Sequence, residues 1–161
     1  MKEIRQIIQL YDQLKAQNVA SALAIVVDVE ASSYRRIGAR LLVAEDGRYV
    51  GGISGGCLEG DALRRARAAI LAAAPATHTY DTMDGEDAVI GIGLGCEGRI
   101  DVLFVPLNYQ DANNEVEALR TLIHIRKKVV MARLLKRQPH DPLEPGLYPI
   151  DNLRLLSAVT G

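Results

Sequence analysis

Apolar residues recur at steps of three and four through residues 2–17, at Ile4, Ile7, Ile8, Tyr11 and Leu14. This period predicts an amphipathic helix with one buried face. The next apolar run, residues 22–29, is almost unbroken and rich in branched side chains. Such a run is typical of an interior strand that is covered on both faces. The chain is therefore predicted to begin with a helix that leads into a central strand.

A hairpin is predicted next, because residues 40–44 and 48–54 are strand-like and Glu45-Asp46-Gly47 lies between them. An Asp-Gly pair tolerates the backbone torsions that a tight reversal needs. Apolar positions then return to a helical period from residue 59 to residue 74, and Pro75 closes this second helix.

The remaining pattern alternates short strands with one more helix. Strands are predicted over residues 77–80, 99–106 and 129–135, with a short closing strand over 153–161, and a helix over 112–125 with Asp111 as a candidate cap. Together these elements predict a single α+β domain, with a mixed, largely antiparallel sheet and about three packing helices. We expect this domain to span residues 1–136. Residues 137–161 contain several prolines and are expected to form a C-terminal arm.

Composition narrows the class of partner. The chain has 161 residues, 48% of them apolar, and a formal net charge of −1. With no global basic field, nucleic acid and anionic membranes are not expected as partners, and a small molecule or a protein is favoured. The sequence contains no apolar run of membrane-spanning length and no signal-peptide pattern, which predicts a cytoplasmic protein. Cys57 and Cys96 lack CxxC spacing and are expected to be thiols.

The stretch with the clearest chemical potential is residues 51–60, where four glycines precede Cys57 and a helix pattern follows. Glycines allow main-chain N–H groups to converge on a bound anion, and a helix N-terminus adds positive potential. A thiol in such a place has a lowered pKa and reacts with electrophiles or soft metals. The alternative is a tight turn in which Cys57 is a small buried hydrophobe.

Two other loops carry candidate chemistry. Residues 91–98 form a second glycine cluster around Cys96 and match G-x-G-x-x-G literally, but a strand pattern follows, so a dinucleotide fold is not predicted. Residues 31–40 combine serine hydroxyls with the guanidinium groups of Arg35, Arg36 and Arg40, which suit phosphate or carboxylate oxygens. The alternative for any one arginine is a solvated side chain paired with a surface acid.

These three loops, in this order, resemble the XdhC/CoxI family of molybdenum-enzyme accessory proteins. The resemblance covers about residues 32–106 and depends mainly on Ser54-Gly55-Gly56-Cys57-Leu58-Glu59 and on residues 93–102, with support from residues 32–40. Family members typically carry a second, Rossmann-like domain, and we expect that domain to be absent here. We therefore expect the chain to correspond to the family's N-terminal domain, as a short member or a fragment.

The resemblance implies a protein that binds the molybdenum cofactor (molybdopterin) transiently and assists its sulfuration and its insertion into a xanthine dehydrogenase-type molybdenum hydroxylase. The implied partners are the apo-hydroxylase, a cysteine desulfurase and a second copy of the chain in a homodimer. The implied metal ligands are Cys57 and Cys96. The cofactor-binding residues carried over are Cys57, Cys96, Gly55, Gly56, Ser54, Arg35, Arg40 and Gly95.

Two alternatives from other classes stay open. The first alternative is a sulfur-transfer enzyme with Cys57 as nucleophile, although no histidine lies near either cysteine in the sequence. The second alternative is a protein-interaction module in which the glycines shape a docking surface. We favour a non-catalytic carrier over both.

Overall fold

The computed structural model describes residues 2–30, 36–81, 98–124, 130–134 and 146–150. The chain divides into two compact units, Met1–Leu107 and Asn108–Gly161. In the described residues, the first unit contains a five-stranded sheet and two helices, and the second contains one helix and a strand pair.

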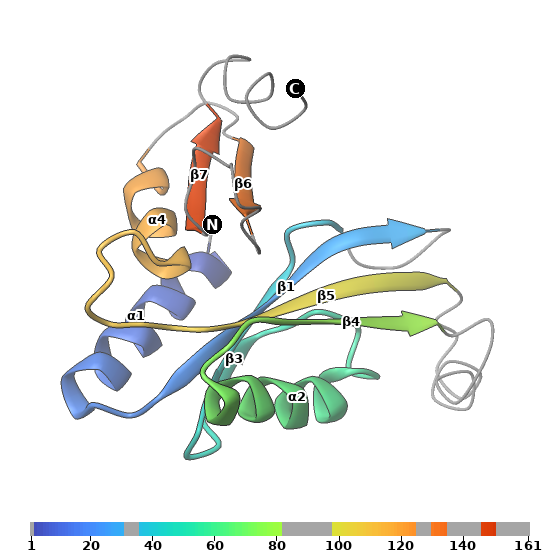
Figure 1. The fold of residues 1–161 in the computed structure, drawn as a ribbon, viewed down its shortest axis with the longest axis horizontal. Coiled ribbons are helices and arrows are strands. Elements are labelled where there is room, and N and C mark those ends of the chain that lie inside the picture. Colours follow the sequence, from blue (N-terminus) through green and yellow to red (C-terminus); the bar gives the residue numbers. More distant parts are fainter. Residues whose placement is uncertain (1, 31–35, 82–97, 125–129, 135–145, 151–161) are drawn as a thin grey trace, which may run out of the picture. The chain divides into compact units, whose positions relative to one another are not determined.

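The sheet of the first unit has the strand order β3-β2-β1-β5-β4, and each neighbouring pair is antiparallel (Figure 1). Its strands are β1 (Ser21–Glu30), β2 (Arg40–Ala44), β3 (Tyr49–Gly51), β4 (Ala76–Asp81) and β5 (Arg99–Pro106). β1 occupies the centre, as its apolar run predicted, and its first six residues are buried or nearly so. Along it the register shifts between Val26 and Asp28, which marks a bulge.

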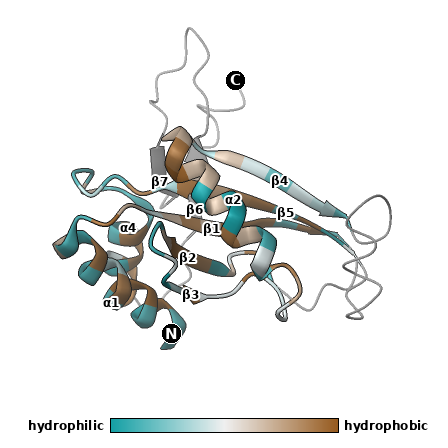
Figure 2. Ribbon diagram, turned by 90° about the horizontal axis from the view of Figure 1, so that it is seen from below, coloured by the Kyte–Doolittle hydropathy of each residue, from teal (hydrophilic) through white to brown (hydrophobic). Residues whose placement is uncertain are grey.

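The two described helices of this unit cover opposite faces of the sheet. Helix α2 (Glu59–Ala72) packs small residues such as Ala62 and Ala66 against Val26, Val43 and Val102. Helix α1 (Lys2–Gln17) buries Ile7, Ile8, Tyr11 and Leu14, and these residues do not belong to the cluster under α2. Because successive strand residues point to opposite faces, Leu42 lies on the other side of β2 from Leu41 and Val43. Figure 2 shows that hydrophobic and hydrophilic residues alternate along the ribbons of α1 and α2.

The β2–β3 hairpin was predicted correctly, but its second strand is shorter than the predicted 48–54. Gly47 forms the reversal with φ +97°, and its N–H donates to the carbonyl of Ala44. β3 ends at Gly51, whose φ is +94°. A Cβ at residue 51 would lie 2.2 Å from the carbonyl oxygen of Arg40, so only glycine fits here without a shift. The chain leaves the sheet at this point and enters the loop that carries Cys57.

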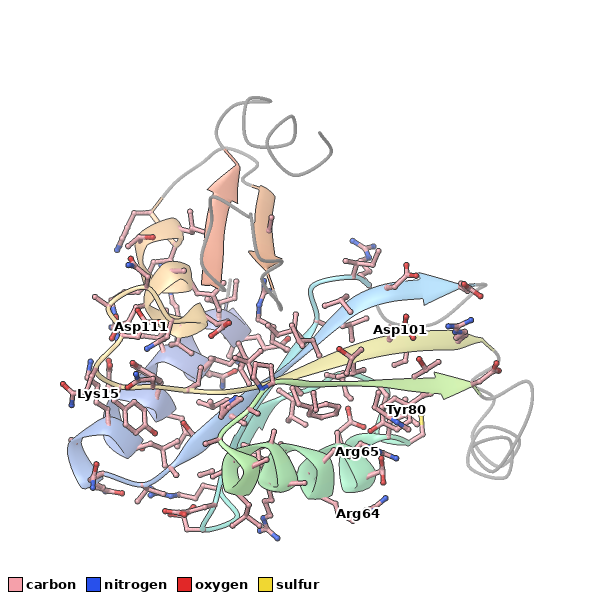
Figure 3. The ribbon with its side chains drawn as sticks, viewed as in Figure 1. Lys15, Arg64, Arg65, Tyr80, Asp101 and Asp111 are labelled. Atoms are coloured by element: carbon pink, nitrogen blue, oxygen red, sulfur yellow. The ribbon has the colours of Figure 1, made fainter. Side chains whose placement is uncertain are left out.

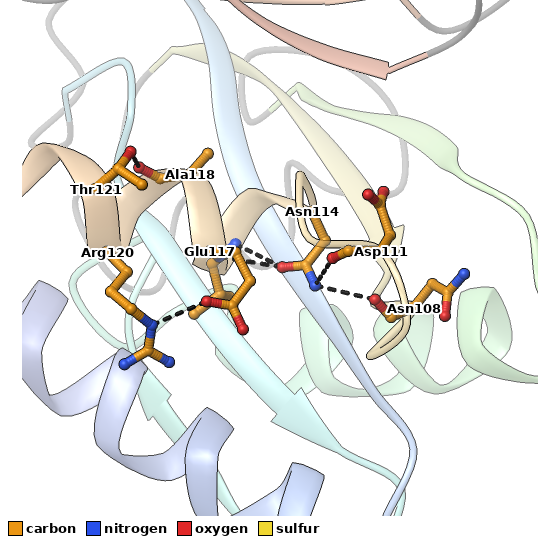
Figure 4. Close-up of polar contacts among 8 residues, drawn as sticks. Asn108, Asp111, Asn114, Glu117, Ala118, Arg120 and Thr121 are labelled. Carbon is orange, nitrogen blue, oxygen red and sulfur yellow. Dashed lines mark hydrogen bonds and ion pairs between the residues drawn. The ribbon is translucent and has the colours of Figure 1, made fainter.

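In the second unit, helix α4 (Glu115–Leu122) is shorter than the predicted 112–125, and its cap is Asn114, not Asp111 (Figure 4). The Asn114 side chain accepts hydrogen bonds from the N–H groups of Val116 and Glu117 at 3.0 and 3.2 Å. Its amide nitrogen donates to the carbonyl oxygens of Asn108 and Asp111, both at 2.9 Å. Asparagine satisfies donors and acceptors on both sides of the turn, which the carboxylate of Asp111 cannot do.

Strands β6 (Val130–Leu134) and β7 (Gly146–Ile150) pair antiparallel in this unit. The α+β class is confirmed, and every strand pair in the described part is antiparallel, so the expected mixture of parallel pairing is not seen there. The arm predicted for residues 137–161 includes β7, while the predicted strand over 153–161 lies outside the described residues. The boundary at residue 136 stays a prediction. None of the described helices is long and apolar enough to span a membrane.

Candidate functional site

The loop between β3 and α2, residues 52–58, places Cys57 just before the helix. Ile53 and Ser54 are buried, Gly55 and Gly56 are exposed, and Cys57 is half-buried and packs against the core under α2. The loop is therefore anchored at both ends, and Gly55 and Gly56 lie at the surface on the N-terminal side of Cys57.

A carboxylate from the helix holds this loop. Glu59, the first residue of α2, accepts hydrogen bonds from the N–H groups of Ile53 and Ser54 at 3.2 and 2.9 Å and from the hydroxyl of Ser54. The Ser54 oxygen in turn accepts from the N–H groups of Gly56 and Leu58 at 3.2 and 3.0 Å. The two residues that flank Cys57 are thus both bonded to one hydroxyl, whose proton is directed at Glu59.

The electrostatics of the loop differ from the sequence-based expectation. Burial acts to raise the pKa of Glu59, but the hydrogen bonds from Ser54 and Ile53 outweigh it, and the pKa lies below its ordinary value. Glu59 is therefore ionised at neutral pH. It and Asp61 place two carboxylates in the first turn of α2, where the sequence predicted an anion site. The N–H groups of Ile53, Ser54, Gly56 and Leu58 are already used within the loop.

Among the described residues, nothing covers the glycines beside Cys57. Gly55, Gly56 and Gly60 are exposed, and a Cβ built at any of them would meet no other group within 4 Å. Because Leu58 and the start of α2 have right-handed helical torsions, the Cα atoms of Cys57 and Gly60 lie within about 7 Å of each other. These three glycines leave room for a bulky group beside the thiol within the described part of the protein.

A second cluster fixes the N-terminal turn of α2 to the end of β4. Asp61 pairs with Arg64 and Arg65 and accepts a 2.8 Å hydrogen bond from the hydroxyl of Tyr80. The Arg65 guanidinium lies 5.8 Å from the centroid of the Tyr80 ring, and Figure 3 shows the two residues side by side. Burial and the Asp61 carboxylate together raise the pKa of Tyr80 well above its usual range. This buried phenol is a structural anchor at neutral pH.

The described residues that flank the three predicted loops lie at one end of the sheet. Glu30, the last residue of β1, is in register with Arg99, the first residue of β5, and Arg99 is in register with Asp81, the last residue of β4. Tyr80 precedes Asp81 and bonds to Asp61 at the start of α2. Figure 1 shows these strand ends together. The loops that contain Arg35 and Cys96, and the helix that follows Cys57, are therefore joined to chain segments that neighbour one another at this end of the sheet.

Arg40 lies elsewhere. It pairs with Ile25 in the sheet and shares the face of Leu42, whereas Leu41 and Val43 face α2. Its guanidinium donates to the carbonyl of Gly38 at 2.6 Å. Burial lowers the pKa of Arg40, and the carboxylate of Glu3 in α1 acts in the opposite direction. The structure therefore places Arg40 on the opposite face of the sheet from the Cys57 loop.

Of the other predicted residues, Ser54, Gly55, Gly56 and Cys57 share the loop described above, whereas Arg35, Gly95 and Cys96 lie outside the described residues. Within the described ranges, no three His, Cys, Asp or Glu side chains form a group that could hold a metal ion. Sequence analysis did not single out Glu59. The available signal was an acidic residue in the first helical turn after a glycine loop.

This geometry defines a class: an α+β unit that presents a half-buried thiol on a glycine loop, at the end of an antiparallel sheet. The model of the XdhC and CoxI family matches residues 14–81, which include β1, the hairpin, the Cys57 loop, α2 and β4. The predicted resemblance to the XdhC and CoxI family is therefore confirmed over these residues.

Two relatives agree with this assignment. The chain is 33% identical over 120 residues to a Bacillus subtilis protein described as a probable xanthine dehydrogenase subunit, and the match covers 74% of this chain and 36% of the relative. It is also similar to the crystal structure of a protein from Bacillus halodurans described as a xanthine dehydrogenase, with a TM-score of 0.57 and 35% identity over 72% of this chain and 33% of the other. The chain thus spans about a third of the length of each relative.

Proposed function

We propose that this chain is part of an accessory protein that binds the molybdenum cofactor and assists its sulfuration and its insertion into a xanthine dehydrogenase-type hydroxylase. The family match and the names of both relatives support an association with xanthine dehydrogenase. The cofactor is the cargo of such a protein, and a cysteine desulfurase and the apo-hydroxylase are its proposed partners. A cytoplasmic location and a homodimer belong to the same proposal.

The observation that carries the proposal is the common origin of the three loops at one end of the sheet. Glu30, Asp81 and Arg99 occupy adjacent register positions, and the Asp61–Tyr80 hydrogen bond ties the start of α2 to them. In the sequence, Cys96 comes three residues before Arg99, the first residue of β5. Such connectivity favours a shared site for two thiols and the arginine loop.

The described residues around Cys57 suit the metal or the sulfur of the cofactor better than its phosphate. A thiol is a ligand for a soft metal or a carrier of sulfur, and Cys57 lies beside exposed glycines that leave room for a large group. A phosphate fits less well against this loop, because four of its amides already donate hydrogen bonds and both Glu59 and Asp61 are acidic. We therefore assign the metal end or the transferred sulfur to Cys57, and we leave the cofactor phosphate to another part of the protein.

The test is an anaerobic titration of the reduced full chain with isolated molybdenum cofactor, followed by transfer to an apo-hydroxylase. Cys57→Ala and Cys96→Ala are compared with wild type and with Arg5→Ala, an exposed change on α1. We expect saturable binding by wild type and Arg5→Ala, and at least tenfold weaker binding by each cysteine variant.

The same variants separate the rival functions. A sulfur-transfer enzyme would form a persulfide on Cys57 and turn over without bound cofactor. An interaction module would bind its partner protein equally well in both cysteine variants. If wild type and both cysteine variants bind the cofactor with equal affinity, the thiols have no part in its capture.

A further inference from the structure

We propose that Glu59 is a positioning residue that sets the conformation of the Cys57 loop through Ser54. This inference rests on the proposed function, because it concerns the loop to which we assign the cofactor or its sulfur. Glu59 itself need not touch the cargo, since it acts on the backbone that carries Cys57.

Ile53 and Leu58 are packed in the core at the two ends of the loop, but the glycine segment between them is not restrained by packing. Gly55 and Gly56 are exposed, with no group near enough to touch a Cβ at either position, and Gly56 has φ +118°. A segment with two exposed glycines has large conformational freedom unless polar contacts restrain it. The Ser54 hydroxyl, which accepts from the N–H groups on both sides of Cys57, supplies that restraint.

Glu59 decides what the Ser54 hydroxyl can do. Because the hydroxyl proton is directed at the Glu59 carboxylate, the lone pairs of the Ser54 oxygen face Gly56 and Leu58. The same carboxylate also accepts from the backbone of Ile53 and Ser54. An ionised acceptor makes stronger hydrogen bonds than a neutral one, so this single side chain organises both halves of the loop.

The chemistry of substitutions at residue 59 follows from this pattern. In Glu59→Gln, an amide NH₂ directed at Ser54 donates where the carboxylate accepted, so it competes with Gly56 and Leu58 for the Ser54 oxygen. Glu59→Asp keeps the charge but is one methylene shorter, so it loses the reach to Ser54. Asp61→Asn is a matched control, because it removes a charge from the same helical turn and its described partners are Arg64, Arg65 and Tyr80.

The first test measures amide hydrogen exchange in the isotope-labelled full chain, with the free energy of unfolding measured for each variant. We expect the Gly56 and Leu58 amides to exchange on the order of tenfold faster in Glu59→Gln and Glu59→Asp. Both variants lose the hydrogen bond from Ser54 to the charged carboxylate, which is among the stronger kinds in proteins and holds the hydroxyl that these amides bond to. Asp61→Asn should leave both amides unchanged once its global stability is taken into account. Unchanged exchange at both amides in Glu59→Gln would overturn the proposal.

The second test measures alkylation of Cys57 by iodoacetamide against pH, in a Cys96→Ala background. A loosened loop should increase the rate severalfold in both Glu59→Gln and Glu59→Asp. If only Glu59→Gln reacts faster, the residue acts through its charge alone, and the positioning role is wrong.

Cofactor titration of the same variants separates this inference from the proposed function. If wild type binds the cofactor and Glu59→Asp binds equally well, positioning by Glu59 is refuted while the carrier function stands. If wild type does not bind but exchange and alkylation change as expected, the positioning role stands and the carrier function fails.

Discussion

Gly51→Ala is the substitution whose effect the structure defines most sharply. Gly51 lies at the end of β3, in register with Leu41, with φ +94°. An alanine Cβ at this position would lie 2.2 Å from the carbonyl oxygen of Arg40 and 3.2 Å from its carbonyl carbon. Ordinary contacts of a Cβ begin near 3.4 Å. The obstructing carbonyl oxygen of Arg40 also accepts a hydrogen bond from the N–H of Gly52, so it cannot move away freely.

The expected cost has two parts. Left-handed torsions cost an alanine about 1–2 kcal/mol relative to glycine. Relief of the steric overlap by a backbone shift costs a further ~1–3 kcal/mol. The sum is about 3 kcal/mol, which for a chain of this size corresponds to a fall in Tm of roughly 6–12 °C.

The assay is urea unfolding of both variants and wild type, followed by circular dichroism, with thermal melts in parallel. Gly55→Ala is the matched control, because it lies in the same loop and its Cβ would meet nothing within 4 Å. We expect it to stay within about 0.5 kcal/mol of wild type, as surface substitutions usually do. Equal stability of the two variants would refute the argument that β3 must end at a glycine.

Four further predictions concern the polar clusters. Removal of the hydroxyl in Tyr80→Phe should cost about 1.5 kcal/mol in the free energy of unfolding, because it breaks a hydrogen bond to the Asp61 carboxylate. In wild type, absorbance titration should find Tyr80 still protonated where exposed tyrosines ionise, since burial raises its pKa. Asn114→Ala should cost ~1–2 kcal/mol in the stability of α4, measured by exchange of the Val116 and Glu117 amides; unchanged exchange would exclude the cap. The pKa of Glu59 is lowered by folding, so its contribution is complete above the ordinary value of 4.5 and is lost as pH falls through the folded value. The difference in unfolding free energy between wild type and Glu59→Gln should therefore shrink in acid, and a constant difference would contradict this assignment.

Most secondary structure could be predicted from local patterns. The apolar period of residues 2–17 gives α1 with the predicted ends, and the Asp-Gly pair gives the β2–β3 reversal. Errors occurred where an element ends for a tertiary reason. β3 ends early because Gly51 approaches the backbone of Arg40, and α4 is capped by Asn114 because that side chain reaches Asn108 and Asp111.

In the candidate site too, local sequence patterns predicted some features and tertiary contacts decided others. Sequence alone identified the glycine loop, Cys57 and the resemblance to the XdhC and CoxI family, because residue types and their spacing carry that information. It could not assign Arg40 to the opposite face of the sheet, since that depends on register with β1. Nor could it foresee that Glu59 uses the loop amides expected to bind an anion. Both facts depend on which groups meet in space after folding, and hydrogen-bond partners of buried polar groups are decided only by the tertiary structure.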